Sequence, residues 1–302
     1  DQNGIWSETT ILRPSDARAS DHFGMSVSIS GDHIIVGSPD EDGPSNFYSG
    51  AGAAYVFQRN AGVWNETAIL HASDLQPGDE FGTSVSISGD LAIVGAMLND
   101  TRGPSAGAAY VFRRNTITGV WSQEAILYAS DAQAQDAFGH SVGISGSYAI
   151  VGAHLEDGGA GTVTCGDPSY TGTACGVGAA YIFERNPTTG TWSEVSKHHS
   201  LNPQEGEYFG YSVAISGNSA IVGANWNNTL RGNSGSAYII RRNSATGIWE
   251  GTAEILASDN YDSDEFGYSV SISDDHAIAG APGEDGGEGH PYRETGAAYI
   301  FD

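Results

Sequence analysis

Short stretches of alternating apolar and small polar residues recur along the whole chain, and glycine-rich turns separate them. The stretch SVSIS at residues 26–30 alternates serine with β-branched residues, and this period of two is typical of a half-buried β-strand. The turn GD joins it to the apolar stretch HIIVGS, as expected for an antiparallel hairpin. AAYVFQR and WNETAIL follow. The pattern therefore predicts four successive strands, and strands rather than helices throughout.

This set of four strands occurs five times with nearly constant spacing. A Phe-Gly pair follows each repeat's tryptophan after 17 positions, a glycine follows the Phe after 14 positions, and GAAY or GSAY comes after a loop of variable length. The repeats start near Trp6, Trp64, Trp121, Trp192 and Trp249. A unit that recurs in this way predicts a repeat architecture. Five four-stranded antiparallel units predict an all-β fold, a five-bladed β-propeller formed by residues 1–302 as a single domain.

The repeat also resembles a known family. The pattern FGMSVSISGD, then IIVGSP, then GAAYVF is similar to the FG-GAP repeat of integrin α-subunit propellers and of microbial secreted proteins. The resemblance covers essentially the whole chain and implies a propeller that mediates extracellular recognition or adhesion. Integrin-type repeats often carry a calcium-binding loop between the first two strands. Here that turn is too short to surround an ion, so those calcium positions are not carried over.

The two ends of the sequence match one another. Residues 297–301 have the sequence of a third strand, and residues 6–12 have the sequence of a fourth. If the ends were joined, Tyr299 and Trp6 would be separated by nine steps, as are Tyr55 and Trp64. We therefore expect the N-terminal strand to complete the last blade and close the ring. A fragment of a larger propeller is one alternative, and donation of the same strand to a neighbouring molecule is another.

Composition limits the partners. The chain of 302 residues has 37 acidic and 12 basic residues, and its formal net charge is −25. Such a surface repels nucleic acid phosphates and anionic lipid, so neither is expected as a partner, and no apolar stretch is long enough to enter a membrane as a spanning helix. The charge suits cations, basic partners or a salty medium.

The repeats differ from one another mainly in the loops of one predicted face, and the acidic residues concentrate in the same loops. These are the loops from the second to the third strand and the loops between blades. Aspartates in the repeated D-x-F-G motif are expected to accept hydrogen bonds from loop amides. Other loop carboxylates suit a hard cation, and calcium is the candidate cofactor. The candidate metal ligands are Asp40, Asp42, Glu156, Asp157, Glu284 and Asp285. Solvated charge is the alternative interpretation of these six residues.

Two further features favour an extracellular location. Cys165 and Cys175 lie in one long loop, and a disulfide between them would stabilise the fold by about 2–3 kcal/mol in an oxidising compartment. Asn65, Asn99 and Asn227 fit the N-glycosylation pattern, and all three are expected on an outer strand or an exposed loop. The chain is therefore expected to be a secreted or cell-surface glycoprotein.

Three functions fit these observations. The first is a non-catalytic recognition or adhesion module that binds a glycan or a protein through its acidic loops, with calcium as the candidate cofactor. The second is a structural subunit that assembles by terminal-strand exchange. The third is a polysaccharide-active, lyase-like enzyme, for which the catalytic candidates are His290, Tyr292 and Arg293 in the loop of the fifth blade. The enzyme interpretation rests on analogy alone.

Overall fold

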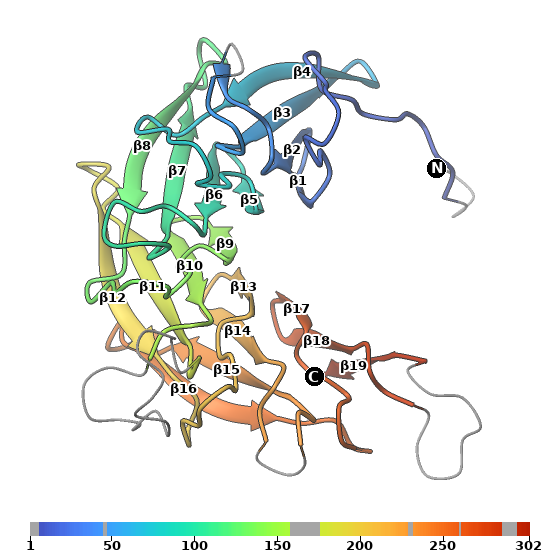
Figure 1. Cartoon of the computed structure of the whole chain (residues 1–302), viewed down its shortest axis with the longest axis vertical. Coiled ribbons are helices and arrows are strands. Elements are labelled where there is room, and N and C mark those ends of the chain that lie inside the picture. The colour runs from blue at the N-terminus through green and yellow to red at the C-terminus, as the bar shows by residue number, and fades with distance from the viewer. Residues whose placement is uncertain (1–5, 45–46, 158–175, 229–231, 260, 286–294) are drawn as a thin grey trace.

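The computed structural model describes residues 6–44, 47–157, 176–228, 232–259, 261–285 and 295–302. These residues form nineteen β-strands in five antiparallel sheets. In Figure 1 the sheets stand side by side as the blades of a propeller, with β1, β5, β9, β13 and β17 innermost. The predicted all-β class and the number of blades are confirmed.

Each blade follows the strand order of the sequence. The first blade contains β1 (Ser26–Ser30), β2 (His33–Ser38), β3 (Ala53–Asn60) and β4 (Val63–Leu70). The second contains β5 (Ser84–Ser88), β6 (Leu91–Ala96), β7 (Ala108–Arg114) and β8 (Trp121–Leu127). The third contains β9 (Ser141–Ser145), β10 (Tyr148–Ala153), β11 (Ala179–Arg185) and β12 (Trp192–His198). The fourth contains β13 (Ser212–Ser216), β14 (Ser219–Ala224), β15 (Ser236–Arg242) and β16 (Trp249–Ile255). The fifth contains β17 (Ser269–Ser273), β18 (His276–Ala281) and β19 (Ala297–Phe301).

The core lies between neighbouring blades. Ile35 and Val56 of the first blade pack with Val85 and Ile87 of the second in one buried cluster. In four of the five blades, the Phe of the Phe-Gly pair packs edge-on against two aromatic rings of the third strand, as Phe81 does at 5.3 Å from the ring of Tyr110. In the fourth blade, Phe209 packs against Tyr238 in a tilted arrangement. Burial of these apolar faces, at about 25 cal/mol for each Å², is the main force that holds the blades together.

Small residues allow the blades to approach closely. A Cβ added to Gly95 on β6 would lie 1.9 Å from the carbonyl oxygen of Gly139 in the next blade, so no larger residue fits there. Serines on the inner strands complete the contact, because Ser28 Oγ accepts a hydrogen bond from the backbone N–H of Ile87 at 3.1 Å. The serine and glycine content of the inner strands thus follows from the packing of sheets around an axis.

The expected closure of the ring is wrong. The fifth sheet has three strands in the order β17-β18-β19, and the described residues 6–14 form no strand. Trp6 is 99% exposed. Figure 1 shows an open arc in which the N-terminal segment leaves the first blade and does not lie on β19. The physical reason is that matching strand sequences specify how two strands pair, whereas closure also needs the first and fifth blades to be adjacent.

Candidate functional site

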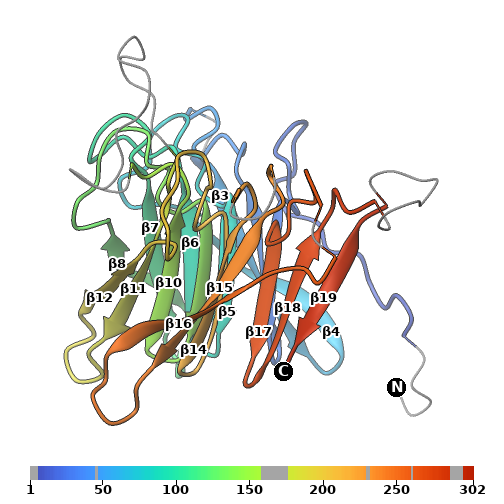
Figure 2. The same ribbon diagram turned by 90° about the horizontal axis from the view of Figure 1, so that it is seen from below.

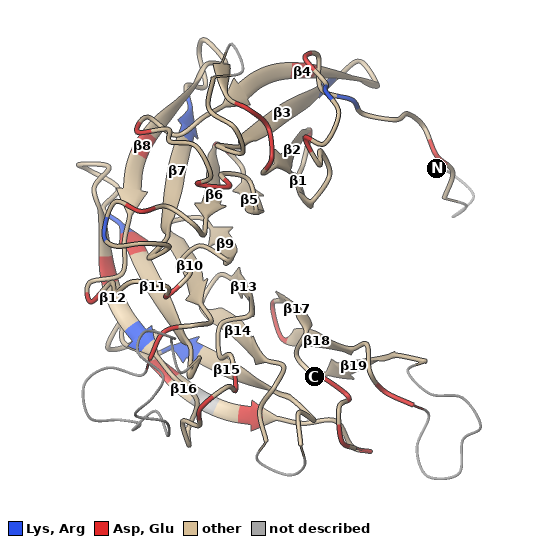
Figure 3. Ribbon diagram, viewed as in Figure 1, with Lys and Arg blue, Asp and Glu red and all other residues tan. Residues whose placement is uncertain are grey.

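The long loops gather on one face of the arc. In Figure 2 the connections from second to third strands and those between blades lie at one end of the strands, opposite the short hairpins. Figure 3 shows acidic segments in the loops of all five blades. Each blade places a cluster of polar side chains beneath these loops, and the same positions of the repeat contribute to every cluster.

A buried acid two residues before the Phe of each Phe-Gly pair anchors the loop between blades. The five acids are Asp21, Asp79, Asp136, Glu207 and Asp264. Asp21 accepts a hydrogen bond from the backbone N–H of Arg18 at 2.6 Å, and Asp136 accepts one from Gln133 at 2.7 Å. The prediction that these carboxylates organise loop amides is confirmed.

Burial raises the pKa of several of these acids. It raises the pKa of Asp136 and of Glu207 to about 7, and that of Asp79 to about 6, with neighbouring carboxylates adding to the effect. Asp136 Oδ1 is buried without a hydrogen-bond partner. These groups therefore gain or lose a proton near neutral pH, unlike solvated carboxylates.

The position four residues after the glycine of the second strand completes the cluster. It holds Glu41, Asn99, Glu156, Asn227 or Glu284, all buried. Asn99 donates a hydrogen bond to Asp79 at 3.0 Å, and Asn227 donates one to Glu207 at 2.8 Å. The expectation that Asn99 and Asn227 are exposed for glycosylation is therefore wrong, because both amides are packed inside the fold. Asn65 is exposed on β4, and its glycosylation stays a prediction.

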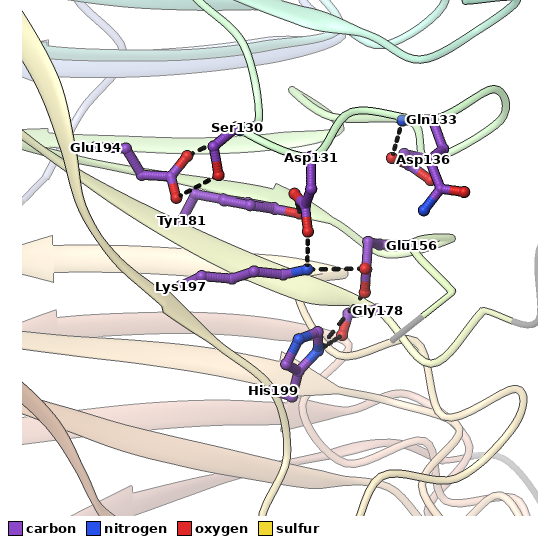
Figure 4. Close-up of polar contacts among 10 residues, drawn as sticks. All are labelled: Ser130, Asp131, Gln133, Asp136, Glu156, Gly178, Tyr181, Glu194, Lys197 and His199. Carbon is purple, nitrogen blue, oxygen red and sulfur yellow. Dashed lines mark hydrogen bonds and ion pairs between the residues drawn. The ribbon is translucent and has the colours of Figure 1, made fainter. Parts of the chain in front are cut away.

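The third blade contains the most highly charged cluster (Figure 4). Lys197 Nζ lies 2.6 Å from Asp131 and 2.8 Å from Glu156. His199 Nδ1 lies 3.6 Å from Glu156 and 2.9 Å from the carbonyl oxygen of Gly178. Burial opposes the charge of the ammonium group, but the hydrogen bonds to Asp131 and Glu156 leave the pKa of Lys197 above its ordinary value. Lys197 therefore holds the position that a metal ion would take between these carboxylates.

The remaining candidate ligands lie in separate blades. Asp40 is 2.5 Å from His22, and Asp42 accepts a hydrogen bond from the backbone N–H of Gly50 at 3.2 Å. Glu284 and Asp285 lie in the fifth blade's loop, and Glu284 is buried. The structure does not bring the six residues together. Among the described residues, no group of three or more His, Cys, Asp or Glu side chains is placed to hold a metal ion.

An aromatic cluster at the inner rim is a feature that the sequence analysis missed. His140, Tyr211 and Tyr268 immediately precede the innermost strands β9, β13 and β17. The ring of Tyr211 lies 5.0 Å from His140 and 5.2 Å from Tyr268. His154 stacks 4.1 Å from His140. Residues from three blades thus form a continuous row of rings on the loop-rich face, close to the axis.

Trp226 and Tyr208 extend the row. Their rings lie 5.0 Å apart, and the ring of Tyr208 is 5.7 Å from that of His154. Trp226 is 38% exposed and Tyr268 is 43% exposed. Burial lowers the pKa of His140 to about 4 and that of His154 to about 3, so both rings are neutral at physiological pH. The resulting surface, called the aromatic rim below, consists of His140, His154, Tyr208, Tyr211, Trp226 and Tyr268.

Several candidate residues lie outside the described part of the chain. They are the catalytic candidates His290, Tyr292 and Arg293, and the two cysteines Cys165 and Cys175. The disulfide and the enzyme interpretation therefore stay predictions. In the described residues there is no helix of a length and apolarity suited to crossing a membrane.

Comparison with known proteins agrees with the architecture. The family model of the FG-GAP repeat matches residues 6–57, 64–112, 121–183, 192–240 and 249–301. Each match begins at a repeat's tryptophan and ends in a third strand, and together the matches cover most of the chain. No curated protein matches the chain.

Proposed function

Because the chain belongs to the FG-GAP repeat family, we propose that it is a non-catalytic recognition module that acts outside the cell and binds a glycan at its aromatic rim. The observation that carries the proposal is the continuous row of aromatic rings contributed by three blades. Two of these rings, those of Trp226 and Tyr268, are substantially exposed. Aromatic faces offer large, rigid contact areas at little cost in conformational entropy. Loops on a rigid scaffold are also where binding residues concentrate.

The charge of the molecule restricts the ligand. A formal net charge of −25 repels anionic polymers. A neutral or amino-bearing sugar avoids this repulsion, and its apolar ring face can stack on Trp226 and Tyr268. A basic protein segment is a second candidate, because the same field would accelerate its association.

Calcium is a separate part of the proposal. In the third blade the carboxylates are already neutralised by Lys197, so an ion is better accommodated by the loops of the first or the fifth blade. Asp40 and Asp42 would hold it in the first, and Glu284 and Asp285 in the fifth. Oxygen ligands of this kind suit calcium better than magnesium, because calcium tolerates irregular coordination.

A glycan-array screen, with and without calcium, tests the proposal directly. We expect neutral or amino sugars to be retained, and Trp226→Ala or Tyr268→Ala to weaken binding of the retained glycan at least tenfold. Trp64→Ala is the matched control, because Trp64 lies at the start of β4 beside the hairpins of the opposite face. Failure to retain any glycan, or equal binding by all three variants, would contradict the proposal.

A further inference from the structure

Three side chains that can bind a soft metal ion meet at the junction between the second and third blades. Met97 follows β6, His140 precedes β9 and His154 follows β10. The Sδ atom of Met97 lies 3.4 Å from Nδ1 of His140, and the ring of His140 lies 4.1 Å from that of His154. All three residues are partly buried. The cluster therefore offers one thioether sulfur and two imidazoles.

Close backbone contacts hold these three side chains near one another. A Cβ added to Gly95 would lie 1.9 Å from the carbonyl oxygen of Gly139 in the next blade, and the methionine follows Gly95 by two residues. The backbone N–H of Gly139 donates a hydrogen bond to the carbonyl oxygen of Gly152 at 3.0 Å. The two histidines come one residue after Gly139 and two residues after Gly152. The strands thus fix the positions from which all three side chains start.

The propeller does not itself require a methionine and two histidines at these positions. The residue after the Phe-Gly pair is, in successive blades, Met25, Thr83, His140, Tyr211 and Tyr268. The residue two positions after the second-strand glycine is Pro39, Met97, His154, Asn225 and Pro282. A thioether and two imidazoles come together only between the second and third blades. Because the other blades form with different residues, the packing of the propeller does not explain this combination.

A hydrogen bond from the imidazole N–H of His140 to the sulfur of Met97 is the simplest explanation of their contact. Thioether sulfur is a weak acceptor, however, and this bond leaves the neighbouring histidine unexplained. The Nδ1 atom of His154 is buried and has no hydrogen-bond partner among the described residues, which is costly for a polar atom. With its proton on Nε2, His154 presents a lone pair at Nδ1. A metal ion that accepts lone pairs from both rings and from the sulfur accounts for all three residues.

The spacing of the donor atoms suits an ion between them. In tetrahedral sites of ions such as zinc, bonds of about 2.3 Å to sulfur and about 2.0 Å to imidazole nitrogen separate the two donor atoms by about 3.5 Å. The 3.4 Å between Met97 Sδ and His140 Nδ1 is close to this value. The ring planes of His140 and His154 are inclined at 44°, so they are not parallel, and rotation about the side-chain bonds can direct both lone pairs at one ion.

The chemistry and the charge of the cluster favour Cu(I). Thioether and imidazole ligands suit this ion, whereas calcium and magnesium require oxygen ligands. Burial lowers the pKa of both histidines, and no carboxylate among the described residues raises it. Both rings are therefore available as neutral ligands. A divalent ion would carry two uncompensated charges into this partly buried site and Cu(I) only one, which is less costly.

We propose that Met97, His140 and His154 together bind one Cu(I) ion. The ring of Tyr211 lies 5.0 Å from that of His140 and 5.7 Å from that of His154, so it shields the ion from water. The proposal does not depend on glycan binding, because it uses sulfur and nitrogen atoms between two blades, whereas a glycan would stack on the exposed rings of the aromatic rim.

Competition with the coloured Cu(I) chelator bicinchoninate, under nitrogen and with ascorbate to keep the metal reduced, tests the proposal. Every protein carries Cys165→Ser/Cys175→Ser, because free thiols would also bind Cu(I). We expect this parent protein to withdraw one equivalent of Cu(I) from the chelator. Met97→Leu, His140→Tyr and His154→Asn should each lower the affinity roughly tenfold or more. Failure of the parent to withdraw Cu(I), or unchanged affinity in all three variants, would overturn the proposal.

The substitutions are chosen to preserve the fold. Tyr211 and Asn225 occupy the positions of the two histidines in the fourth blade, and leucine replaces methionine at similar volume. Met25→Leu is the matched control, because Met25 is the chain's other methionine and lies in the first blade, just before β1. Its affinity for Cu(I) should equal that of the parent. A loss as large as that of Met97→Leu would contradict the proposed site.

X-ray absorption at the copper edge identifies the ligands without any substitution among them. The Cu(I)-loaded parent should show sulfur together with imidazole nitrogen, and the sulfur should be absent from Met97→Leu. Because both cysteines have been replaced, the sulfur can come only from a methionine. A parent spectrum with nitrogen or oxygen ligands alone would overturn the proposal even if Cu(I) were bound.

Discussion

Replacing Lys197 with isoleucine is expected to destabilise the third blade, because it leaves Asp131 and Glu156 facing one another without the shared ammonium group. Glu156 is 1% exposed and Lys197 20% exposed, and breaking a buried ion pair on one side costs about 3–5 kcal/mol. Asp131 is 41% exposed, so solvent screens its interaction with Lys197. We therefore expect the substitution to lower the free energy of unfolding by about 3 kcal/mol. At roughly 2–4 °C for each kcal/mol in a chain of this size class, Tm should fall by about 6–12 °C.

The second blade indicates which additional substitution should restore the stability lost in Lys197→Ile. Its residues at the positions of Glu156 and Lys197 are Asn99 and Ile126. In Glu156→Asn/Lys197→Ile the new amide can donate to Asp136, as Asn99 donates to Asp79. The double variant should therefore return to within about 1 kcal/mol of the wild type, as expected when two residues act as one unit.

Scanning calorimetry at pH 7 and low salt is the assay for this cycle. The wild type, the two single variants and the double variant give the coupling energy directly. A fall in Tm of less than about 2 °C for Lys197→Ile would refute the reasoning, because the carboxylates would then not depend on the ammonium group. A double variant as unstable as Lys197→Ile would also refute it, because the Asn and Ile of the second blade would then not be able to replace Glu156 and Lys197 in the third.

Three further outcomes follow from the structure. Because the pKa of Asp136 is raised, the folded chain keeps a proton that the unfolded chain loses near pH 4. The free energy of unfolding should therefore fall as pH rises from about 4 to 7. Urea unfolding across this range should show a flatter dependence of that free energy on pH for Asp136→Asn. Gly95→Ala should lower Tm by several degrees because the added Cβ clashes with the next blade, whereas the Cβ of Gly251→Ala would meet no atom within 4 Å and should leave Tm unchanged. Calcium at low millimolar concentration should raise Tm more than sodium chloride of equal ionic strength does. Loss of that effect in Asp40→Asn/Asp42→Asn would place an ion in the first blade. Equal effects of the two salts would indicate screening alone.

Periodicity predicts the blades well because each blade is locally specified. SVSIS became β1 within the predicted bounds, and WNETAIL lies inside β4. Alternation decides which face of a strand is buried, and the turn chemistry decides where the strand ends. Both signals lie within a few residues of the element that they specify, so they can be read without knowledge of the rest of the fold.

The candidate site was less predictable because its residues meet only when blades pack. His140, Tyr211 and Tyr268 belong to three repeats, and nothing in the sequence of one repeat indicates a ring in the next. The burial of Asn99 arises within one blade: its amide is fixed by Asp79 and by Tyr110 at 3.1 Å. These partners are 20 and 11 residues away in the sequence, which shows only a polar residue in a loop. Aligning the five repeats position by position could have found the aromatic rim, because the residue two positions after the Phe of the Phe-Gly pair is aromatic in three blades.

Closure of the ring depends on a quantity that no single repeat encodes. Each junction contributes a small rotation between neighbouring blades, and the sum over four junctions decides whether the first and fifth blades meet. Strand matching, as between residues 6–12 and β19, is independent of that sum. The sequence can therefore specify that residues 6–12 match β19, whereas the packing of the blades decides whether that segment reaches it.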